Sequence, residues 1–208
     1  VGLQGVAISE RACQDALAYA GDRLQGRSFD GENSVPILDH PDVKRMLLDM
    51  TSLTEAGRAL AYEAAAALDK SRAGDAAAGA YMDLLTPVVK AWCTDKALKV
   101  TSDAIQVHGG MGFIEETGVA QHYRDARILP IYEGTNGIQA NDLVFRKVIR
   151  DNGDTMRDYL HHLEGITQDL KSKADYLHPY LLEASEHLES ATKVILDFGN
   201  ANPERVAA

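Results

Sequence analysis

The sequence predicts an all-α protein, for three reasons. Apolar residues recur at helical spacing along almost all of the 208 residues. Strands are not visible in this pattern. Glycine, proline, asparagine and aspartate interrupt it at a limited number of positions, as expected for turns between helices. The pattern therefore favours a bundle of helices, with two further amphipathic helices appended as a hairpin at its C-terminal end.

The first two predicted helices lie before residue 72. The first ends within residues 26–33, which are rich in turn formers. The second begins at Pro41-Asp42, because proline suits the first helical position and aspartate suits the positive N-terminal end. The apolar stripe of the first helix consists of Val6, Cys13, Leu17, Ala20 and Leu24.

Small residues and glycine dominate residues 72–79, where we expect a loop. A short helix is predicted over residues 80–85. Thr86-Pro87 then indicates the cap and the first position of a new helix, which Gly109-Gly110 ends.

A shorter helical piece is expected near residues 117–124. Pro130 prevents a helix from continuing into the segment that follows it, and the next helix is predicted from about residue 135 to residue 150. Asn152-Gly153 breaks the chain again. His178-Pro179 then separates the two helices of the predicted hairpin.

Composition restricts the possible partners and locations. The net charge of −10 argues against nucleic acid or an anionic membrane as a main partner, because both require a basic surface. No secretory signal or bilayer-spanning apolar run is visible, so a cytoplasmic location is expected. Cys13 and Cys93 lack metal or redox spacing and are expected to be buried thiols in a reducing compartment. Because Val1 is not a start methionine, we expect a piece of a longer protein.

Glu133 is the principal candidate for chemistry. It lies within the run Ile-Leu-Pro-Ile-Tyr-Glu, and a carboxylate in apolar surroundings has a raised pKa that makes it a better general base near neutral pH. The alternative is a structural role, in which Glu133 interacts with the positive end of the helix that starts nearby. Spacing alone leaves both interpretations open.

Several glycines follow the helix that precedes this run. Gly109, Gly110 and Gly112 form a turn that allows a backbone to approach a phosphate or a ring closely, although a helix C-cap is the more common reason for such a pattern. The turn does not lie between a strand and a helix, so it is not a dinucleotide-binding fingerprint. His108 beside it suits a structural histidine at a helix end.

Arg23 is the other candidate for ligand binding. A cation at the end of the first helix is favourable by itself, and a guanidinium can also pair with a phosphate. His161 and His162 point to different helix faces, and no His, Cys, Asp or Glu cluster has ligand spacing, so no metal site is expected. No Ser-His-Asp arrangement is suggested either.

Taken together, five segments resemble the C-terminal helical domain of the acyl-CoA dehydrogenase family. Their order and spacing match the family from Val1 to about residue 150. The run from Tyr132 onward, with the appended hairpin, most resembles the branch that contains 3-methylmercaptopropionyl-CoA dehydrogenases. The matching segments are Tyr-Ala-x-x-Arg at 19–23, His-Pro-Asp-Val at 40–43, Gln-Val-His-Gly-Gly-Met-Gly-Phe at 106–113, Arg-Asp-Ala-Arg at 124–127 and Ile-Tyr-Glu-Gly-Thr at 131–135.

The resemblance implies a fold for each part of the chain. Residues 1–150 would form the four-helix up-and-down bundle that ends the family's chain, and residues 151–208 the additional C-terminal hairpin. The N-terminal helical domain and the middle β-domain of the family would be absent from this sequence. The isolated piece is then expected to bind FAD weakly and to have no turnover.

The resemblance also implies a reaction and its partners. Glu133 matches the base that removes the pro-R α-proton of an acyl-CoA while a hydride leaves the β-carbon for FAD, giving a trans-2-enoyl-CoA. Arg23 matches the residue that contacts the FAD pyrophosphate of a neighbouring subunit in a homodimer or homotetramer. Electron-transfer flavoprotein would accept the electrons. Gln106, Gly110 and Thr135 match further FAD-contacting positions.

The match has departures, and other functions remain open. Gln25-Gly26, Gly137 and Gln139-Ala140 differ from residues found in many members, which affects the expected adenine contacts. Relatives with this fold include acyl-CoA oxidases and flavoproteins linked to alkylated DNA, although Glu133 and the acidic charge disfavour the latter. A non-catalytic helical oligomerisation module is the alternative from another class.

Overall fold

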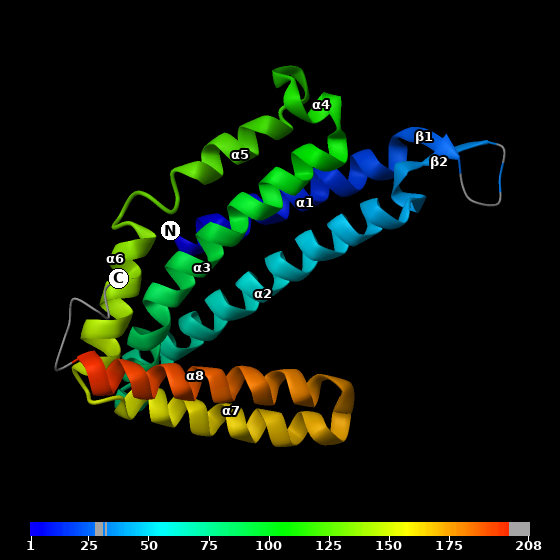
Figure 1. Cartoon of the computed structure of the whole chain (residues 1–208). Coiled ribbons are helices and arrows are strands. Elements are labelled where there is room, and N and C mark those ends of the chain that lie inside the picture. Colours follow the sequence, from blue (N-terminus) through cyan, green and yellow to red (C-terminus); the bar gives the residue numbers. More distant parts are fainter. Residues whose placement is uncertain (28–30, 32, 200–208) are drawn as a thin grey trace. The chain divides into compact units, whose positions relative to one another are not determined.

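The computed structural model describes residues 1–27, 31 and 33–199, and the predicted all-α class is confirmed. Parts of the predicted loop at 26–33 and of the predicted domain at 151–208 lie outside the described residues. Figure 1 shows the chain with its helices and strands labelled. In chain order these are α1 (Gly2–Asp22), β1 (Leu24–Arg27), β2 (Ser34–Pro36), η1 (Ile37–Asp39), α2 (Pro41–Arg72), α3 (Ala76–His108), α4 (Gly110–Phe113), η2 (Glu115–Thr117), α5 (Val119–Arg127), α6 (Asn136–Asn141), η3 (Asp142–Ile149), α7 (Asp154–Lys173), η4 (Asp175–Leu177) and α8 (His178–Gly199).

The described residues form two compact units, and the long helices α2 and α3 contribute to both. The first unit contains Val1–Glu63 and Val89–Asn136. The second contains Ala64–Val88 and the described residues from Gly137 onward. The domain boundary expected at residue 150 stays a prediction.

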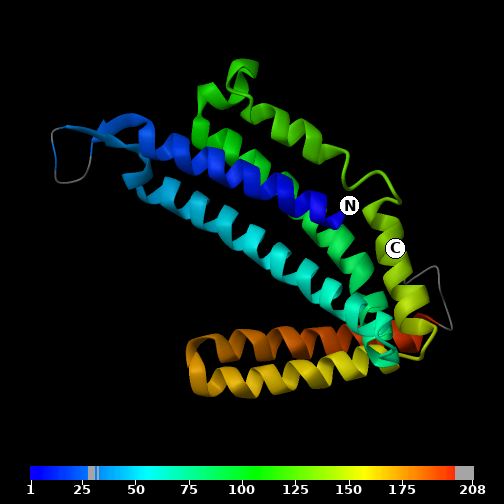
Figure 2. The same cartoon turned by 180° about the vertical axis from the view of Figure 1, so that it is seen from behind.

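The first unit contains an up-and-down bundle of α1, α2, α3 and α5. Figures 1 and 2 show successive helices of this set running in alternating directions. Burial of their apolar side chains from water is the main force that holds the bundle together. The core cluster consists of Ala12, Ala16 and Ala20 of α1, Met46, Leu47 and Met50 of α2, Val100, Ala104 and Val107 of α3, and Val119 of α5.

The buried face of α1 differs from the predicted stripe. Leu17 and Leu24 are more than half exposed, whereas alanines at four-residue spacing face the core. Small residues allow a close approach between helices: a Cβ atom on Gly5 would lie 2.6 Å from the carbonyl oxygen of Cys93 on α3. Val6 and Ala20 of the predicted stripe are buried, and close helix packing selects small residues for the rest of this face.

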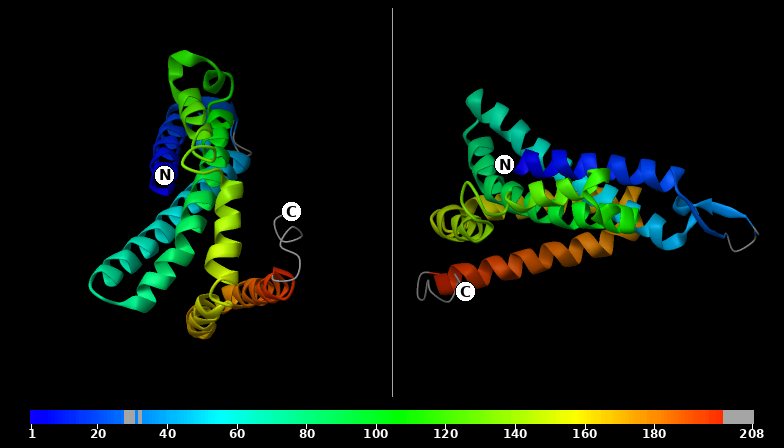
Figure 3. Two further views of the ribbon diagram at one scale, coloured as in Figure 1. Left: turned by 90° about the vertical axis from the view of Figure 1, so that its left-hand side faces the viewer. Right: turned by 90° about the horizontal axis from the view of Figure 1, so that it is seen from above.

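Two short strands are present where none was predicted. β1 and β2 pair antiparallel, with Leu24 opposite Pro36 and Arg27 opposite Ser34. Gly26 has φ +74°, and the register is irregular between Leu24 and Arg27, as at a bulge. The ribbon extends beyond the ends of the helices of the first unit (Figure 3, right). Because its strands are short and largely exposed, no alternating apolar pattern marks them.

The predicted break at Thr86-Pro87 is wrong, because α3 is one helix with Pro87 inside it. Proline removes one backbone hydrogen bond and crowds the carbonyl four residues earlier. The Pro87 ring is fully buried, so tertiary packing offsets this cost. Thr86 donates its hydroxyl proton to the Met82 carbonyl at 2.8 Å within the same helix instead of capping a new one. The start of α2 at Pro41 is confirmed.

The second unit contains the predicted hairpin of α7 and α8, which lie side by side in Figures 1 and 2. The predicted helix after residue 135 begins as α6 but continues as the π-helical segment η3. Tyr81 of α3 stacks on Tyr159 of α7 with ring centroids 5.8 Å apart. The buried centre consists of Leu84, Val148 and Met156, with Leu143, Tyr159, Leu160, Leu188, Ile195 and Leu196 packed against it.

Asp151 caps the start of α7. Its carboxylate accepts the backbone N–H groups of Gly153 and Thr155, both at 3.0 Å, and the Thr155 hydroxyl at 2.6 Å. Burial acts to raise its pKa, but these hydrogen bonds prevail and hold the pKa of Asp151 below its ordinary value. A lowered folded-state pKa stabilises the fold above the unfolded-state value, and the effect is lost as pH falls through the folded value.

Asp151→Asn should therefore lower the free energy of unfolding by about 1 kcal/mol near neutral pH, because the amide keeps one acceptor oxygen and loses the hydrogen bonds made by the other. The difference should begin to shrink below about pH 4, the unfolded-state pKa of an aspartate, and should be lost below the lowered folded-state pKa, where the carboxylate is protonated in both states. Urea unfolding of both proteins at neutral pH and in acid measures this difference in the free energy of unfolding. Asp158→Asn, on an exposed position of α7, should show neither effect. An Asp151→Asn deficit that persists unchanged in acid would contradict this account.

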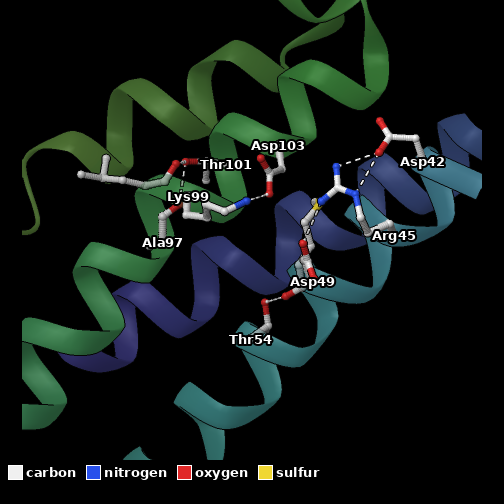
Figure 4. A network of polar contacts seen from close by, with 10 residues as sticks. Asp42, Arg45, Asp49, Thr54, Ala97, Lys99, Thr101 and Asp103 are labelled. Atoms are coloured by element: carbon white, nitrogen blue, oxygen red, sulfur yellow. Dashed lines mark hydrogen bonds and ion pairs between the residues drawn. The ribbon is translucent and has the colours of Figure 1, made fainter.

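Surface ion pairs line α2 and α3 (Figure 4). Arg45 contacts Asp42 at 2.8 Å and Asp49 at 3.1 Å, and Lys99 pairs with Asp103. Such exposed pairs on one helix contribute about 0.3–0.5 kcal/mol each, so they support the helices without forming a site.

Among the described residues, no helix is both long enough and apolar enough to cross a membrane.

Both cysteines are free thiols, and the predicted burial is confirmed for Cys93 but not for Cys13. Cys93 is buried, and desolvation raises its pKa to about 11, which keeps the thiol protonated and unreactive. Cys13 is only partly buried and lies 3.3 Å from the hydroxyl oxygen of Thr54. Its pKa is also raised by desolvation.

Candidate active site

The loop between α5 and α6 carries Glu133 in an unusual backbone conformation. Glu133 has φ +56° and Gly134 has φ +84°, so two successive residues adopt left-handed backbone. Glycine accepts this conformation readily, but a residue with a side chain pays about 1–3 kcal/mol for it. Such strain persists only where surrounding contacts impose it, and it concentrates at functional sites.

Contacts on both sides of Glu133 hold this loop. The backbone N–H of Asn136 donates to the Pro130 carbonyl at 3.0 Å and closes the loop. The Tyr132 hydroxyl donates to the side-chain oxygen of Gln4 on α1. Glu133 therefore lies on a short segment that is fixed to its neighbours before and after it.

The carboxylate itself is exposed in this chain, which differs from the predicted burial in apolar surroundings. Ile128 and Ile131 are about half exposed, and only Leu129 of the neighbouring run is buried. The apolar residues near Glu133 in sequence thus face other directions and do not enclose it. Glu133 lies three residues before α6, which begins at Asn136 and has no acidic residue in its first turn, so Glu133 is not part of that helix.

Arg23 opens onto a pocket at the other end of α1. It is the C-cap of α1 and is exposed, and its guanidinium donates to the neutral side-chain oxygen of Gln25 at 3.2 Å. With the described residues it forms no ion pair, so its positive charge is available to an anion. The pocket has a volume of about 280 Å³ and is lined by Tyr19, Arg23, Gln25, Gly26, Ile37, His40, Val43, Val107, His108 and Gly109.

Two histidines form the polar wall of this pocket. His108 is buried, donates from Nδ1 to the Ala104 carbonyl at 2.8 Å and stacks on Tyr19 at 4.3 Å between ring centroids. These contacts agree with the structural role at a helix end that the sequence suggested for His108. The Nε2 atom of His40 lies 2.7 Å from the carbonyl oxygen of Gln25, to which it donates.

The glycines after α3 have different reasons to be glycine. Gly109 adopts φ +58° and ψ −138°, which favours glycine strongly. A Cβ atom on Gly112 would lie 2.2 Å from the Ile105 carbonyl oxygen, so close packing requires glycine there. A Cβ atom on Gly110 would meet nothing within 4 Å. The fold of this chain therefore explains Gly109 and Gly112 but gives no reason for Gly110.

The structure divides the predicted site residues into two groups. Arg23, Gln106 and Gly110 lie at the ends of α1 and α3, whereas Glu133 and Thr135 lie in the loop beside the start of α1. Gln4 and Arg23 are nineteen residues apart on α1, which corresponds to about 28 Å at the rise of an α-helix. The two groups cannot contact the same small group of atoms.

Comparison with known proteins identifies the family. The sequence model of the acyl-CoA dehydrogenase C-terminal domain matches residues 1–147, which is most of the chain. The chain belongs to the acyl-CoA dehydrogenase family. This result agrees with the resemblance in the sequence and with the helical fold.

Individual members of the family match over different lengths. The chain is 49% identical to 3-methylmercaptopropionyl-CoA dehydrogenase of Ruegeria pomeroyi, over the whole chain and 37% of that relative. It resembles butyryl-CoA dehydrogenase of Megasphaera elsdenii with 34% identity and a TM-score of 0.57, covering 68% of this chain and 33% of that one. ACDH-11 of Caenorhabditis elegans, solved in complex with C11-CoA, shares the fold over 98% of this chain and 33% of its own, with 22% identity and a TM-score of 0.83. The chain thus spans about a third of the length of each.

One contact beside the loop that carries Glu133 was not predicted from the sequence. Asn136 is held to α3 by several hydrogen bonds, one of them from Lys90, which is only 7% exposed. Desolvation lowers the pKa of Lys90, and the charge of Asp95 opposes that shift. The one available signal was a lysine inside the apolar run 87–92.

In the described part of the chain, no three His, Cys, Asp or Glu residues come together as a metal site would require.

Proposed function

We propose that this chain is the C-terminal part of a flavin-dependent acyl-CoA dehydrogenase that converts an acyl-CoA thioester into a trans-2-enoyl-CoA. The observation that carries the proposal is the left-handed backbone of Glu133, held between two anchored residues in a member of this family. Backbone strain of this kind clusters at functional sites. The appended hairpin is part of the same polypeptide.

Glu133 acts as the general base. Its carboxylate takes the proton from the carbon next to the thioester, and the electron pair of that C–H bond forms the new double bond as a hydride leaves the β-carbon. When bound, FAD supplies the acceptor for that hydride. The exposure of Glu133 in this chain leaves its carboxylate accessible to a thioester, and the rest of a full-length enzyme would exclude water around it.

The residues at the far end of α1 fit a bound FAD. The guanidinium of Arg23, which donates to the neutral side chain of Gln25, suits a pyrophosphate, with which it can form charge-assisted hydrogen bonds. Gly110 leaves its backbone open to close approach by a ligand. Gln106 and Thr135 are both exposed and provide polar contacts to the cofactor in this proposal.

Because the two groups of site residues are far apart along α1, each group contacts a different FAD molecule in this proposal. Glu133 and Thr135 serve the FAD of their own subunit, and Arg23, Gln106 and Gly110 reach that of a neighbour. This arrangement requires a homodimer or homotetramer. Electron-transfer flavoprotein is the proposed electron acceptor, and a cytoplasmic location remains a prediction.

Anaerobic mixing of the full-length flavoprotein with acyl-CoA thioesters of increasing chain length tests the reaction. We expect the visible absorbance of the flavin to bleach, and the preferred length to give the fastest phase. The control is the isolated 208-residue chain, which should lose added FAD on gel filtration and show no bleaching, because a base without positioned cofactor and substrate supplies little catalysis. No bleaching of the full-length protein with any thioester would contradict the proposal. Rapid reoxidation by oxygen alone would favour an acyl-CoA oxidase.

A further inference from the structure

The side chain of Asn136 joins a buried cation to a carboxylate. Lys90 Nζ donates to Asn136 Oδ1 at 2.6 Å, and Asn136 Nδ2 donates to Asp95 Oδ1 at 2.8 Å. An ammonium group can only donate and a carboxylate can only accept. The oxygen of Asn136 must therefore face Lys90 and its nitrogen must face Asp95. Only a neutral amide satisfies both partners at this position.

Further hydrogen bonds complete the attachment to α3. Asn136 Nδ2 also lies 3.0 Å from Thr94 Oγ1 and 3.2 Å from the Ala91 carbonyl. Thr94 donates its own proton to the Lys90 carbonyl at 2.8 Å, so its oxygen is free to accept from the amide. Thr94 is fully buried. On this buried side hydrogen bonds are strong and an unpaired polar group is costly, whereas Asp95 and its hydrogen bond are exposed. The contacts with Lys90 and Thr94 therefore define the position of Asn136 most firmly.

Asn136 transmits this position to Glu133. Its backbone N–H closes the loop onto the Pro130 carbonyl, and only Gly134 and Thr135 separate it from Glu133. On the other side, Tyr132 is tied to Gln4. If the anchor at Asn136 were released, the left-handed backbone of Glu133 could relax toward an ordinary conformation, because that conformation is strained for a residue with a side chain.

We propose that Asn136 is a positioning residue for Glu133: its amide, held between Lys90 and Asp95, keeps the base in its strained conformation and directs the carboxylate toward the substrate α-carbon. This inference rests on the proposed function, because it requires Glu133 to act as the base. The side chain of Asn136 is hydrogen-bonded to α3 and does not itself act on the substrate.

The first test is Asn136→Ala in the full-length, flavin-bound protein. We expect kcat to fall about 10- to 100-fold, the cost of a small misplacement of a reacting group, while KM for acyl-CoA and the FAD content per chain stay within twofold. The control is Asn141→Ala, the same change at the end of α6, where the side chain forms no capping hydrogen bond. It should leave kcat unchanged.

The second test exchanges the amide and the carboxylate. Asn136→Asp alone places two carboxylates side by side and removes the donor to Asp95, so kcat should fall as in Asn136→Ala. Adding Asp95→Asn restores a donor facing an acceptor while Lys90 still donates to position 136, with no change in net charge relative to wild type. The double variant should recover kcat at least about fivefold over Asn136→Asp, because the hydrogen bond between an amide and a carboxylate is restored.

Two results would overturn the inference. One is an Asn136→Ala variant with reduced thermal stability but kcat per bound flavin within twofold of wild type. The other is a double variant no faster than Asn136→Asp. Comparison with Glu133→Gln separates the two proposals. If Glu133→Gln abolishes turnover while Asn136→Ala does not lower kcat, only the positioning role fails. If Glu133→Gln remains active, the proposed function fails with it.

Discussion

Glu133→Gln in the full-length protein should lower the rate of acyl-CoA dehydrogenation by about 10³-fold or more and leave FAD bound. Glutamine has nearly the same shape as glutamate, so the left-handed backbone and its anchors at Tyr132 and Asn136 should survive. It cannot accept the α-proton, and general base catalysis is therefore lost. Stopped-flow bleaching of the flavin measures the chemical step, and absorbance of the resting protein measures flavin content.

Glu116→Gln provides the matched control for this change. Glu116 is an exposed glutamate in η2, within the same unit of the chain, and its replacement should leave the rate unchanged. A Glu133→Gln protein with near-normal turnover would end the assignment of the base. It would instead favour a helical oligomerisation module, for which light scattering should show a dimer or tetramer that Glu133 does not affect.

Arg23→Gln should weaken FAD binding about 10- to 100-fold, because a hydrogen bond to a charged group contributes about 1.5–3 kcal/mol. The guanidinium has only a neutral partner among the described residues, so its removal leaves no carboxylate unpaired in the fold. Protein stability should therefore change little. Titration of flavin-free full-length protein with FAD measures the affinity, and the difference should diminish at high salt if the contact is exposed.

Arg27→Gln tests whether the effect depends on position and not on charge alone. Arg27 is an exposed arginine at the end of β1 that does not line the pocket. It changes the net charge by the same amount and should leave FAD affinity within about twofold of wild type, as expected for a surface charge outside a binding site. Equal losses in both variants would indicate a general electrostatic effect and would contradict a specific pyrophosphate contact.

Much of the helical architecture could be predicted because its signals are local. Pro41 begins α2, and Gly109 and Gly110 end α3. The backbone restrictions that these residues impose act within one helical turn. Glu133 stood out because one carboxylate interrupts an apolar run. Its exposure was not predictable in the same way, because neighbours in sequence did not become neighbours that enclose it.

Other features depend on residues that are far apart in the chain. Pro87 remains inside α3 because tertiary packing buries its ring. α1 buries alanines and not leucines because α3 approaches closely enough to meet Gly5. Neither outcome can be obtained from helical periodicity, which shows that a face is apolar but not how near its partner lies.

The sequence by itself determined the helical class, the start of α2, the end of α3, and the residues that carry the family resemblance, since each depends on residue type and short-range spacing. Only the tertiary structure decided that Asn136 meets Lys90 across 46 positions of sequence and that Glu133 adopts a left-handed backbone. Hydrogen bonds between distant segments form only after the helices have packed, because the free energy of burying apolar surface, and not the local sequence, brings their donors and acceptors together.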